Sequence, residues 1–108
     1  MTTSPHDIAI TGYLTIARIP GDGDRLLDEY RRSSAAMSEV GRDHGLIVHA
    51  GAKADDGFVI VNLWPSKDGS EAAARDPRRL AALGRAPVDP AAIRREHLDM
   101  AHYVVFGS

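Results

Sequence analysis

Hydrophobic and polar residues alternate near the start of the chain, which is typical of a half-buried β-strand. In the segment Ile8–Ile19, aliphatic residues such as Leu14 and Ile16 share one face, while Tyr13 and Thr15 share the other. The proline and glycine that follow end this predicted strand.

The pattern then changes to helical spacing. Apolar residues recur every three or four positions through Arg25–His44. Asp22 or Asp24 can serve as the N-cap, and Gly45 is the residue type that commonly follows a helix C-terminus. The sequence therefore predicts one long amphipathic helix after the first strand.

Two apolar segments follow this helix, Leu46–Lys53 and Gly57–Trp64. The link between them, residues 54–57, is short and polar and ends in Asp-Gly, which is a strong hairpin signal. Pro65 ends the second segment. These segments are predicted to be paired antiparallel strands.

The second half of the chain predicts an interrupted helix and a last strand. Asp68, followed three residues later by a glutamate, resembles a capping box. Asp76-Pro77 restarts a short helix, Arg78–Leu83, and Asp89-Pro90 opens a turn before the last strand, at about His97–Phe106. The order β-α-β-β-α-β predicts an α+β, ferredoxin-like fold: a four-stranded antiparallel sheet with both helices on one face.

Composition limits the possible functions of this small protein. The 108 residues suit one domain over 1–108, of which the polar segment 1–7 is expected to be flexible. A net charge of −2 and a pI near 6.2 argue against a nucleic-acid partner. The absence of cysteine excludes disulfides and thiolate chemistry. Without a membrane-length apolar run or a signal peptide, we expect no membrane partner and a cytoplasmic location.

The strand Gly57–Trp64 is apolar on both of its faces. Val59, Val61 and Leu63 are uniformly aliphatic, so we predict that they face the helices. The alternating residues Phe58, Ile60, Asn62 and Trp64 are then predicted on the uncovered face of the sheet. Because such a face is too apolar to be left in water, we expect a second copy of the chain to cover it as a homodimer.

Candidate acid–base groups lie on the strands. Three histidines, His49, His97 and His102, together with Tyr13, could titrate or donate usefully, and the pattern does not decide which histidine faces a cavity. No histidines form a helical i, i+4 pair, and His97-x-Asp99 lacks a visible third ligand, so no metal site is expected. The arginines of the second half are interpreted as a solvated helix face in preference to an anion site; they are Arg75, Arg78, Arg79, Arg85, Arg94 and Arg95.

The stretch from Gly57 to Asp68, GFVIVNLWPSKD, resembles a signature of the dimeric α/β-barrel superfamily. It is similar to the branch around antibiotic biosynthesis monooxygenase-like and haem-degrading proteins, in which a strand beginning Gly-aromatic ends in Trp-x-Ser and runs into the second helix. The element order and length match over nearly the whole chain, whereas the residue-level match covers about a dozen positions.

The resemblance implies a dimer with Asn62 and Trp64 lining a pocket. In the cofactor-free quinol-oxygenating members, an asparagine and a tryptophan at this strand help to hold the substrate's oxygens. A deprotonated phenol or quinol can activate oxygen itself, so no cofactor is expected. Haem-degrading members use an asparagine on the first strand and a histidine on the second helix. This sequence has Tyr13 or Thr11 in the former region and no histidine in residues 51–96, so haem binding by that route is not expected.

Three functions from different classes follow from these observations. The first is a monooxygenase-like enzyme acting without a bound cofactor on an aromatic or polyketide-like substrate, held by Asn62, Trp64, Phe58 and Ile60. The second is a non-catalytic ligand-binding or stress-associated dimer with the same cavity. The third, an RNA-binding module, is disfavoured by the net charge and by Ile60 and Asn62, where exposed aromatic residues would be needed.

Overall fold

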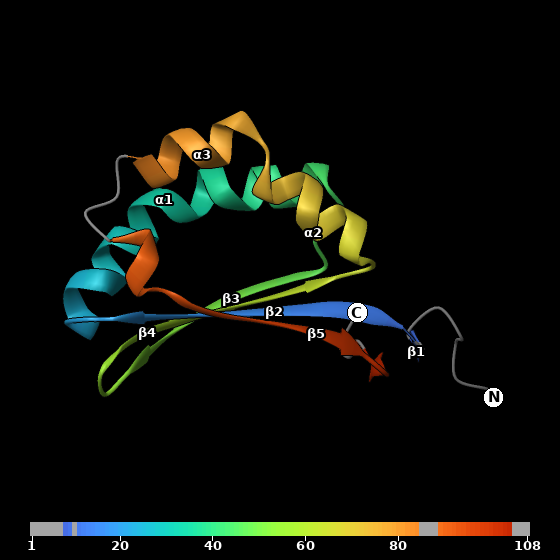
Figure 1. Cartoon of the computed structure of the whole chain (residues 1–108), viewed down its shortest axis with the longest axis horizontal. Coiled ribbons are helices and arrows are strands. Elements are labelled where there is room, and N and C mark those ends of the chain that lie inside the picture. The colour runs from blue at the N-terminus through green and yellow to red at the C-terminus, as the bar shows by residue number, and fades with distance from the viewer. Residues whose placement is uncertain (1–7, 10, 85–88, 105–108) are drawn as a thin grey trace.

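The computed structural model describes residues 8–9, 11–84 and 89–104. Its centre is a four-stranded sheet with all of the helices on one face (Figure 1). In chain order the elements are β1 (Ile8–Ala9), β2 (Gly12–Pro20), α1 (Gly23–Asp43), β3 (Val48–Ala54), β4 (Gly57–Trp64), α2 (Lys67–Ala74), α3 (Pro77–Gly84), a 3₁₀ turn (Pro90–Ala92), β5 (Arg94–Met100) and β6 (Tyr103–Val104).

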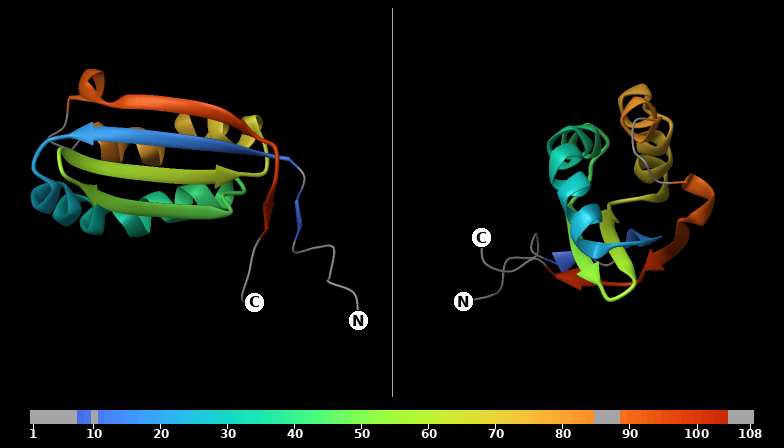
Figure 2. Two further views of the ribbon diagram at one scale, coloured as in Figure 1. Left: turned by 90° about the horizontal axis from the view of Figure 1, so that it is seen from below. Right: turned by 90° about the vertical axis from the view of Figure 1, so that its left-hand side faces the viewer.

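The sheet has the strand order β3-β4-β2-β5, and every neighbouring pair is antiparallel. Figure 2 shows this order from the side without helices, with β3 and β5 at the two edges. The predicted ferredoxin-like α+β fold, with its helices on one face, is confirmed.

Most of the local signals in the sequence act as predicted. Asp22 caps α1, because its Oδ1 accepts a hydrogen bond from the backbone N–H of Asp24 at 3.2 Å. Gly45 follows α1 with a φ of 89°, in the region that favours glycine. The second helix begins earlier than predicted, since Ser66 rather than Asp68 is its N-cap and accepts from the N–H of Gly69.

The first and last predicted strands are each divided in two. The short strands β1 and β6 pair with each other in a separate two-stranded sheet, in which Ile8 lies opposite Val104. The last strand also begins earlier than predicted, at Arg94 (β5), and is interrupted at Ala101–His102. Phe106, the predicted end of this strand, lies outside the described residues.

The predicted assignment of the two sheet faces is wrong. Phe58, Ile60 and Asn62 point toward the helices, because they line a pocket there together with residues of α1 and α3. The aliphatic set Val59, Val61 and Leu63 therefore lies on the face without helices. The physical reason is that alternation along a strand separates two sets of side chains but does not decide which set the helices cover.

The hydrophobic core lies where α1 and α2 cross one end of the sheet. Tyr13, Val40, Trp64 and Ala73 form its buried cluster, and Leu46 packs against them. The indole Nε1–H of Trp64 donates to Thr15 Oγ1 at 3.4 Å. This end of the helix layer is thus closed by packing, while the other end, near α3, contains the pocket. No helix within the described ranges is both long and apolar enough to cross a membrane.

The break between α2 and α3 is fixed by an ionic network around Asp76. Its carboxylate accepts from Arg78 Nη2 at 2.9 Å and lies 3.0 Å from His44 Nε2. Arg78 also pairs with Asp43 at 2.9 Å, so the end of α1 and the start of α3 are joined. The hydrogen bonds from Arg78 and then His44 hold the pKa of Asp76 well below its usual value of 3.8.

This network predicts a specific loss of stability in acid. Because the pKa of Asp76 is lower in the folded state, its contribution is complete above pH 3.8 and is lost as the pH falls further. We expect Asp76→Asn to melt at a lower temperature than the wild type at pH 6, with the difference shrinking toward pH 3. Melting curves across this range, with the exposed Asp28→Asn as the control, test the prediction. An equal difference at both pH values would contradict it.

Candidate functional site

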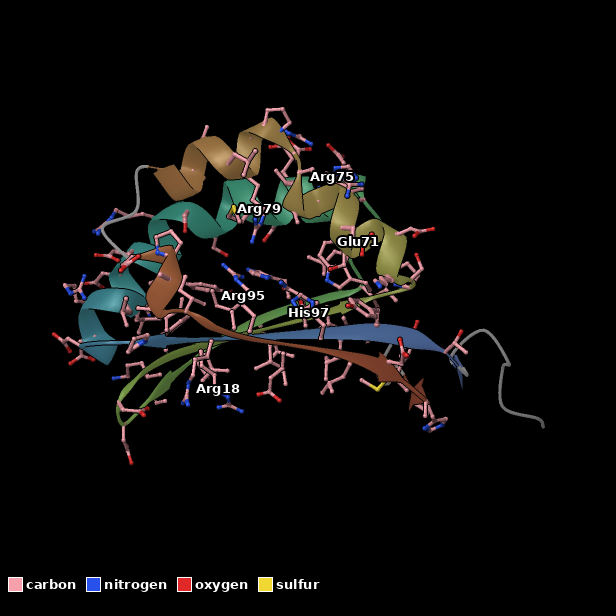
Figure 3. The ribbon with its side chains drawn as sticks, in the orientation of Figure 1. Arg18, Glu71, Arg75, Arg79, Arg95 and His97 are labelled. Carbon is pink, nitrogen blue, oxygen red and sulfur yellow. The ribbon has the colours of Figure 1, made fainter. Side chains whose placement is uncertain are left out.

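A pocket of about 510 Å³ lies between the sheet and the helices α1 and α3; we call it the helix–sheet pocket. Its floor comes from all four strands of the main sheet, and its roof comes from the two helices. Figure 3 shows side chains from α3 and from β5 entering this space from opposite sides.

The lining combines an apolar surface with a few polar groups. The apolar side chains are Ala17, Ile19, Leu26, Tyr30, Ala36, Met37, Phe58, Ile60, Ala82 and Ile93. The polar side chains are Glu29, Arg32, Ser33, Ser34, His49, Asn62, Arg79 and Arg95. Such a mainly apolar concave surface with a small number of polar groups is typical of small-molecule sites.

His49 is the histidine that lines the pocket. It lies on β3 directly opposite Asn62 of β4, and its Nδ1 is 2.5 Å from Asn62 Oδ1. Since an amide oxygen can only accept, this orientation places a proton on Nδ1. Tyr30 of α1 stacks on the imidazole, with ring centroids 5.4 Å apart and planes 22° apart. The ring is therefore held both at its edge and on its face.

The other ring nitrogen of His49 has no hydrogen-bond partner in the part of the chain that the structure describes. Its Nε2 is buried and makes no hydrogen bond among the described residues. A buried polar atom without a partner is uncommon in folded proteins and costs free energy. With the proton on Nδ1, this Nε2 carries a lone pair that can accept a hydrogen bond or a proton; because the atom is buried, a ligand reaches it only when a neighbouring side chain shifts.

A glycine allows the aromatic residues to approach the sheet. Tyr30 lies over β3 and β4, with its ring centroid 4.9 Å from that of Phe58. A Cβ at Gly51 would lie 2.7 Å from the Tyr30 ring and 2.9 Å from the Phe58 ring, closer than real side chains come. Gly51 therefore leaves the space that Tyr30 needs in order to reach His49.

Two arginines face each other across the opposite part of the pocket. Arg79 descends from α3 and Arg95 rises from β5, and their side chains point toward one another (Figure 3). Burial lowers the pKa of the Arg79 guanidinium, and the nearby charge of Arg95 lowers this pKa further. The interpretation as part of a solvated face is thus wrong for Arg79, which is half-buried in the pocket lining, whereas Arg95 is exposed and also lines the pocket.

The predicted site residues separate into two groups. Phe58, Ile60 and Asn62 line the helix–sheet pocket together with His49. The remaining predicted residues, Trp64, Tyr13, His97 and His102, are not part of its lining.

The second group lies elsewhere in the fold. Trp64 and Tyr13 are only 5% and 8% exposed and belong to the core cluster. His97 is exposed beside Tyr13, with ring centroids 6.0 Å apart, and His102 is exposed in the break between β5 and β6. Residues of the helices, above all Tyr30, were missed as site residues. Tyr30 fits the apolar stripe of α1, and nothing in the pattern marks it as a ligand contact.

Within the ranges that the structure describes, no group of three or more histidine, aspartate or glutamate side chains is arranged to hold a metal ion.

Known structures share this architecture over most of its length. The monooxygenase ActVA-Orf6 of Streptomyces coelicolor, solved in complex with nanaomycin D, has a TM-score of 0.61 and 19% identity, covering 91% of this chain and 90% of that one. SnoaB, a cofactor-independent oxygenase from Streptomyces nogalater, has a TM-score of 0.55 and 16% identity. The match covers 94% of this chain and 96% of SnoaB.

A third structure has the same fold. A dimeric ferredoxin-like protein of unknown function from Thermobifida fusca has a TM-score of 0.55 and 22% identity, covering 84% of this chain and 91% of that one. No protein-family model matches the sequence, and no curated protein matches it either. The chain therefore has the ferredoxin-like fold of the antibiotic biosynthesis monooxygenase-like proteins, and the resemblance found in the sequence is confirmed at the level of the fold.

Proposed function

We propose that this protein is a small oxygenase that acts, without a bound cofactor, on an aromatic or polyketide-like phenol or quinol in the helix–sheet pocket. The observation that carries the proposal is the buried Nε2 of His49, which has no partner among the described residues and belongs to a ring held by Asn62 and Tyr30. The fold shared with ActVA-Orf6 and SnoaB supports the reaction class.

His49 is the proposed general base. Asn62 holds the imidazole through Nδ1, and the lone pair of Nε2 takes a proton from a bound hydroxyl or from an acidic ring carbon. The apolar lining from Phe58, Ile60 and Met37 excludes water from the resulting anion. An electron-rich anion of this kind is the species that reacts with molecular oxygen.

The oxygen chemistry can be written for an anthrone, in which a ring CH₂ becomes a carbonyl. Loss of one proton to His49 gives a carbanion, which transfers one electron to O₂ and then combines with the superoxide to form a C–O bond. Reprotonation gives a hydroperoxide, and loss of water from it leaves the quinone. The balance is CH₂ + O₂ → C=O + H₂O, with O₂ as the oxidant and the ring carbon as the group oxidised.

Oxygen uptake tests the proposal. With 1,8-dihydroxyanthrone as the probe, we expect the protein to accelerate uptake above the rate of spontaneous oxidation, with one O₂ consumed for each quinone formed. Labelling with ¹⁸O₂ should place one labelled atom in the new carbonyl, and prior dialysis against a chelator should leave the rate unchanged. Binding of the anthrone without accelerated uptake would instead favour the non-catalytic ligand-binding protein.

We also infer that the protein assembles as a homodimer through the sheet face without helices, which we call the open sheet face. Leu14 of β2 lies between Leu63 and Leu98 on this face, and Ile16 lies opposite Val61. Leu98 is 46% exposed and Val48 is 45% exposed. A contiguous aliphatic surface of this kind usually marks an interface. The dimeric neighbour of the same fold supports this inference.

A charge on the open sheet face is expected to separate the two subunits. At micromolar concentration, light scattering should give the wild type a mass near twice 11.6 kDa, and Leu98→Asp should give the monomer mass. The control is Leu80→Asp, because Leu80 is 54% exposed on α3, outside the open sheet face. A wild-type monomer at this concentration, or separation by Leu80→Asp alone, would show that the open sheet face is not the interface.

A further inference from the structure

The charges that line the helix–sheet pocket are unbalanced. Among the described residues, three arginines line it with one glutamate, Glu29; they are Arg32, Arg79 and Arg95. That glutamate is already paired with Arg25, whose Nη1 lies 3.0 Å from Glu29 Oε1. The pocket therefore presents a positive end without a carboxylate of the described chain to neutralise it.

Arg79 and Arg95 concentrate this positive charge at one place. Arg79 is half-buried, and its hydrogen bond within the described residues is a long one, 3.5 Å from Nη1 to the carbonyl oxygen of Ala74. Arg95 lies close enough to repel it, and neither guanidinium forms an ion pair in the part of the chain that the structure describes. A half-buried guanidinium beside a second group of the same charge is a costly arrangement unless an anion joins them, even though Arg95 itself is exposed.

We infer that Arg79 and Arg95 form an anionic subsite that binds a carboxylate of the substrate, so that the substrate is a fused-ring aromatic acid. This inference rests on the proposed function of the same pocket and adds to it the substrate's charge and orientation. A guanidinium presents paired N–H groups that match the two oxygens of a carboxylate. The apolar side chains between the two ends, including Tyr30, Phe58 and Ile60, then contact the rings.

The sheet order sets the length of such a ligand. His49 lies on β3 and Arg95 on β5, the two edge strands, which are separated by three strand spacings. At the usual spacing this is roughly 14 Å between strand axes. His49 contacts Asn62 on the neighbouring strand, which shortens the distance to be spanned, so a ring system of two or three fused rings can reach from one end of the pocket to the other. A carboxylate bound at Arg95 would direct the far ring to His49.

A matched pair of ligands tests the subsite. Anthraquinone-2-carboxylate and anthraquinone-2-carboxamide differ in charge and hardly in shape, and both should quench Trp64, the one tryptophan of the sequence. We expect the wild type to bind the carboxylate at least tenfold more tightly than the carboxamide. Arg79→Gln and Arg95→Gln should each lower the affinity for the carboxylate by about 10- to 100-fold, because a hydrogen-bonded charge is lost. Each should change the affinity for the carboxamide by less than about twofold.

Arg75→Gln is the matched control, because Arg75 is an exposed arginine at the end of α2 and outside the pocket lining. This variant should bind both ligands with the same affinity as the wild type. Melting of the free protein gives a second readout. Arg79→Gln should raise the melting temperature, because it removes a desolvated charge that a neighbouring charge repels, whereas a purely structural arginine would lower it on removal.

The outcomes separate this inference from the proposed function. If the carboxylate and the carboxamide bind equally and neither arginine variant matters, the pocket remains an aromatic site and the anionic subsite is wrong. If neither ligand binds the wild type, both the aromatic pocket and the subsite are overturned. If the carboxylate is preferred but only Arg75→Gln removes the preference, the anion binds elsewhere and the assignment to Arg79 and Arg95 fails.

Discussion

Replacement of Trp64 by alanine should lower the free energy of unfolding by about 3–5 kcal/mol, the usual loss for a buried aromatic residue. Trp64 is 5% exposed and packs with Tyr13, Val40 and Ala73 where α1 and α2 cover the sheet. Truncation would leave a cavity there that these neighbours, held by two helices and a strand, cannot fill. Such a loss is a large part of the 5–15 kcal/mol that stabilises a typical domain.

Urea unfolding at one fixed protein concentration measures this effect, since the stability of a dimer depends on concentration. The matched control is Asn62→Ala, two residues earlier on the same strand face. This variant should lower the free energy of unfolding much less than Trp64→Ala does. It should weaken the binding of an aromatic ligand by about 1–3 kcal/mol, because the ring of His49 loses its hydrogen-bond partner. If Trp64→Ala keeps its stability but loses ligand binding, Trp64 is a substrate contact after all, as the family resemblance implies.

The element order was predictable because each boundary carries its own local chemistry. Gly45 has a positive φ that few other residues adopt, and Asp22 supplies the acceptor that the first turn of α1 needs. Asp76-Pro77 marks the break between the two short helices, where the Asp76 carboxylate accepts from the backbone of Arg78 at 2.9 Å. These signals depend on neighbours in the sequence and not on the tertiary structure.

The two faces of the sheet could not be assigned in the same way. Alternation along Gly57–Trp64 separates the side chains into two sets but does not say which set the helices cover. One signal was available in the sequence: Gly51, in the middle of a strand, indicates close approach of another group. That group is the ring of Tyr30 from α1, so the face of Gly51, which also carries Phe58, is the helix-covered one.

The candidate site was only partly predictable for a related reason. His49 and Asn62 are opposite each other because of the hairpin register, which the Asp-Gly turn sets. The choice of His49 over His97 and His102 depends on the helices that enclose one part of the sheet and leave the rest open. Arg79 differs from its neighbour Arg78 only in its direction around α3, and a short helix after a break gives no reliable direction. The position of Arg79 in the pocket could therefore not be predicted from the sequence.

Removal of the imidazole of His49 should have the largest effect on catalysis. We expect His49→Gln to lower the turnover of 1,8-dihydroxyanthrone by about 10²–10⁴-fold, the usual contribution of a positioned general base. The variant should remain folded, because His49 is only half-buried and lies on an edge strand, and a melting curve checks this. His97→Gln is the matched control, since His97 lies on the same side of the sheet but outside the pocket lining, and should change turnover less than about twofold.

The substrate's own acidity distinguishes a base from a residue that only packs. If His49 removes the proton, the loss of turnover caused by His49→Gln should become smaller along a series of anthrones of increasing acidity. The reason is that a more acidic substrate ionises with a weaker base. If His49 only packs, the loss of turnover should be the same for every anthrone in the series, and the variant should also bind the anthrones more weakly. Stopped-flow measurement of anion formation without oxygen isolates this step from the later reaction with O₂. Wild-type rates of anion formation in His49→Gln would place the base elsewhere in the pocket.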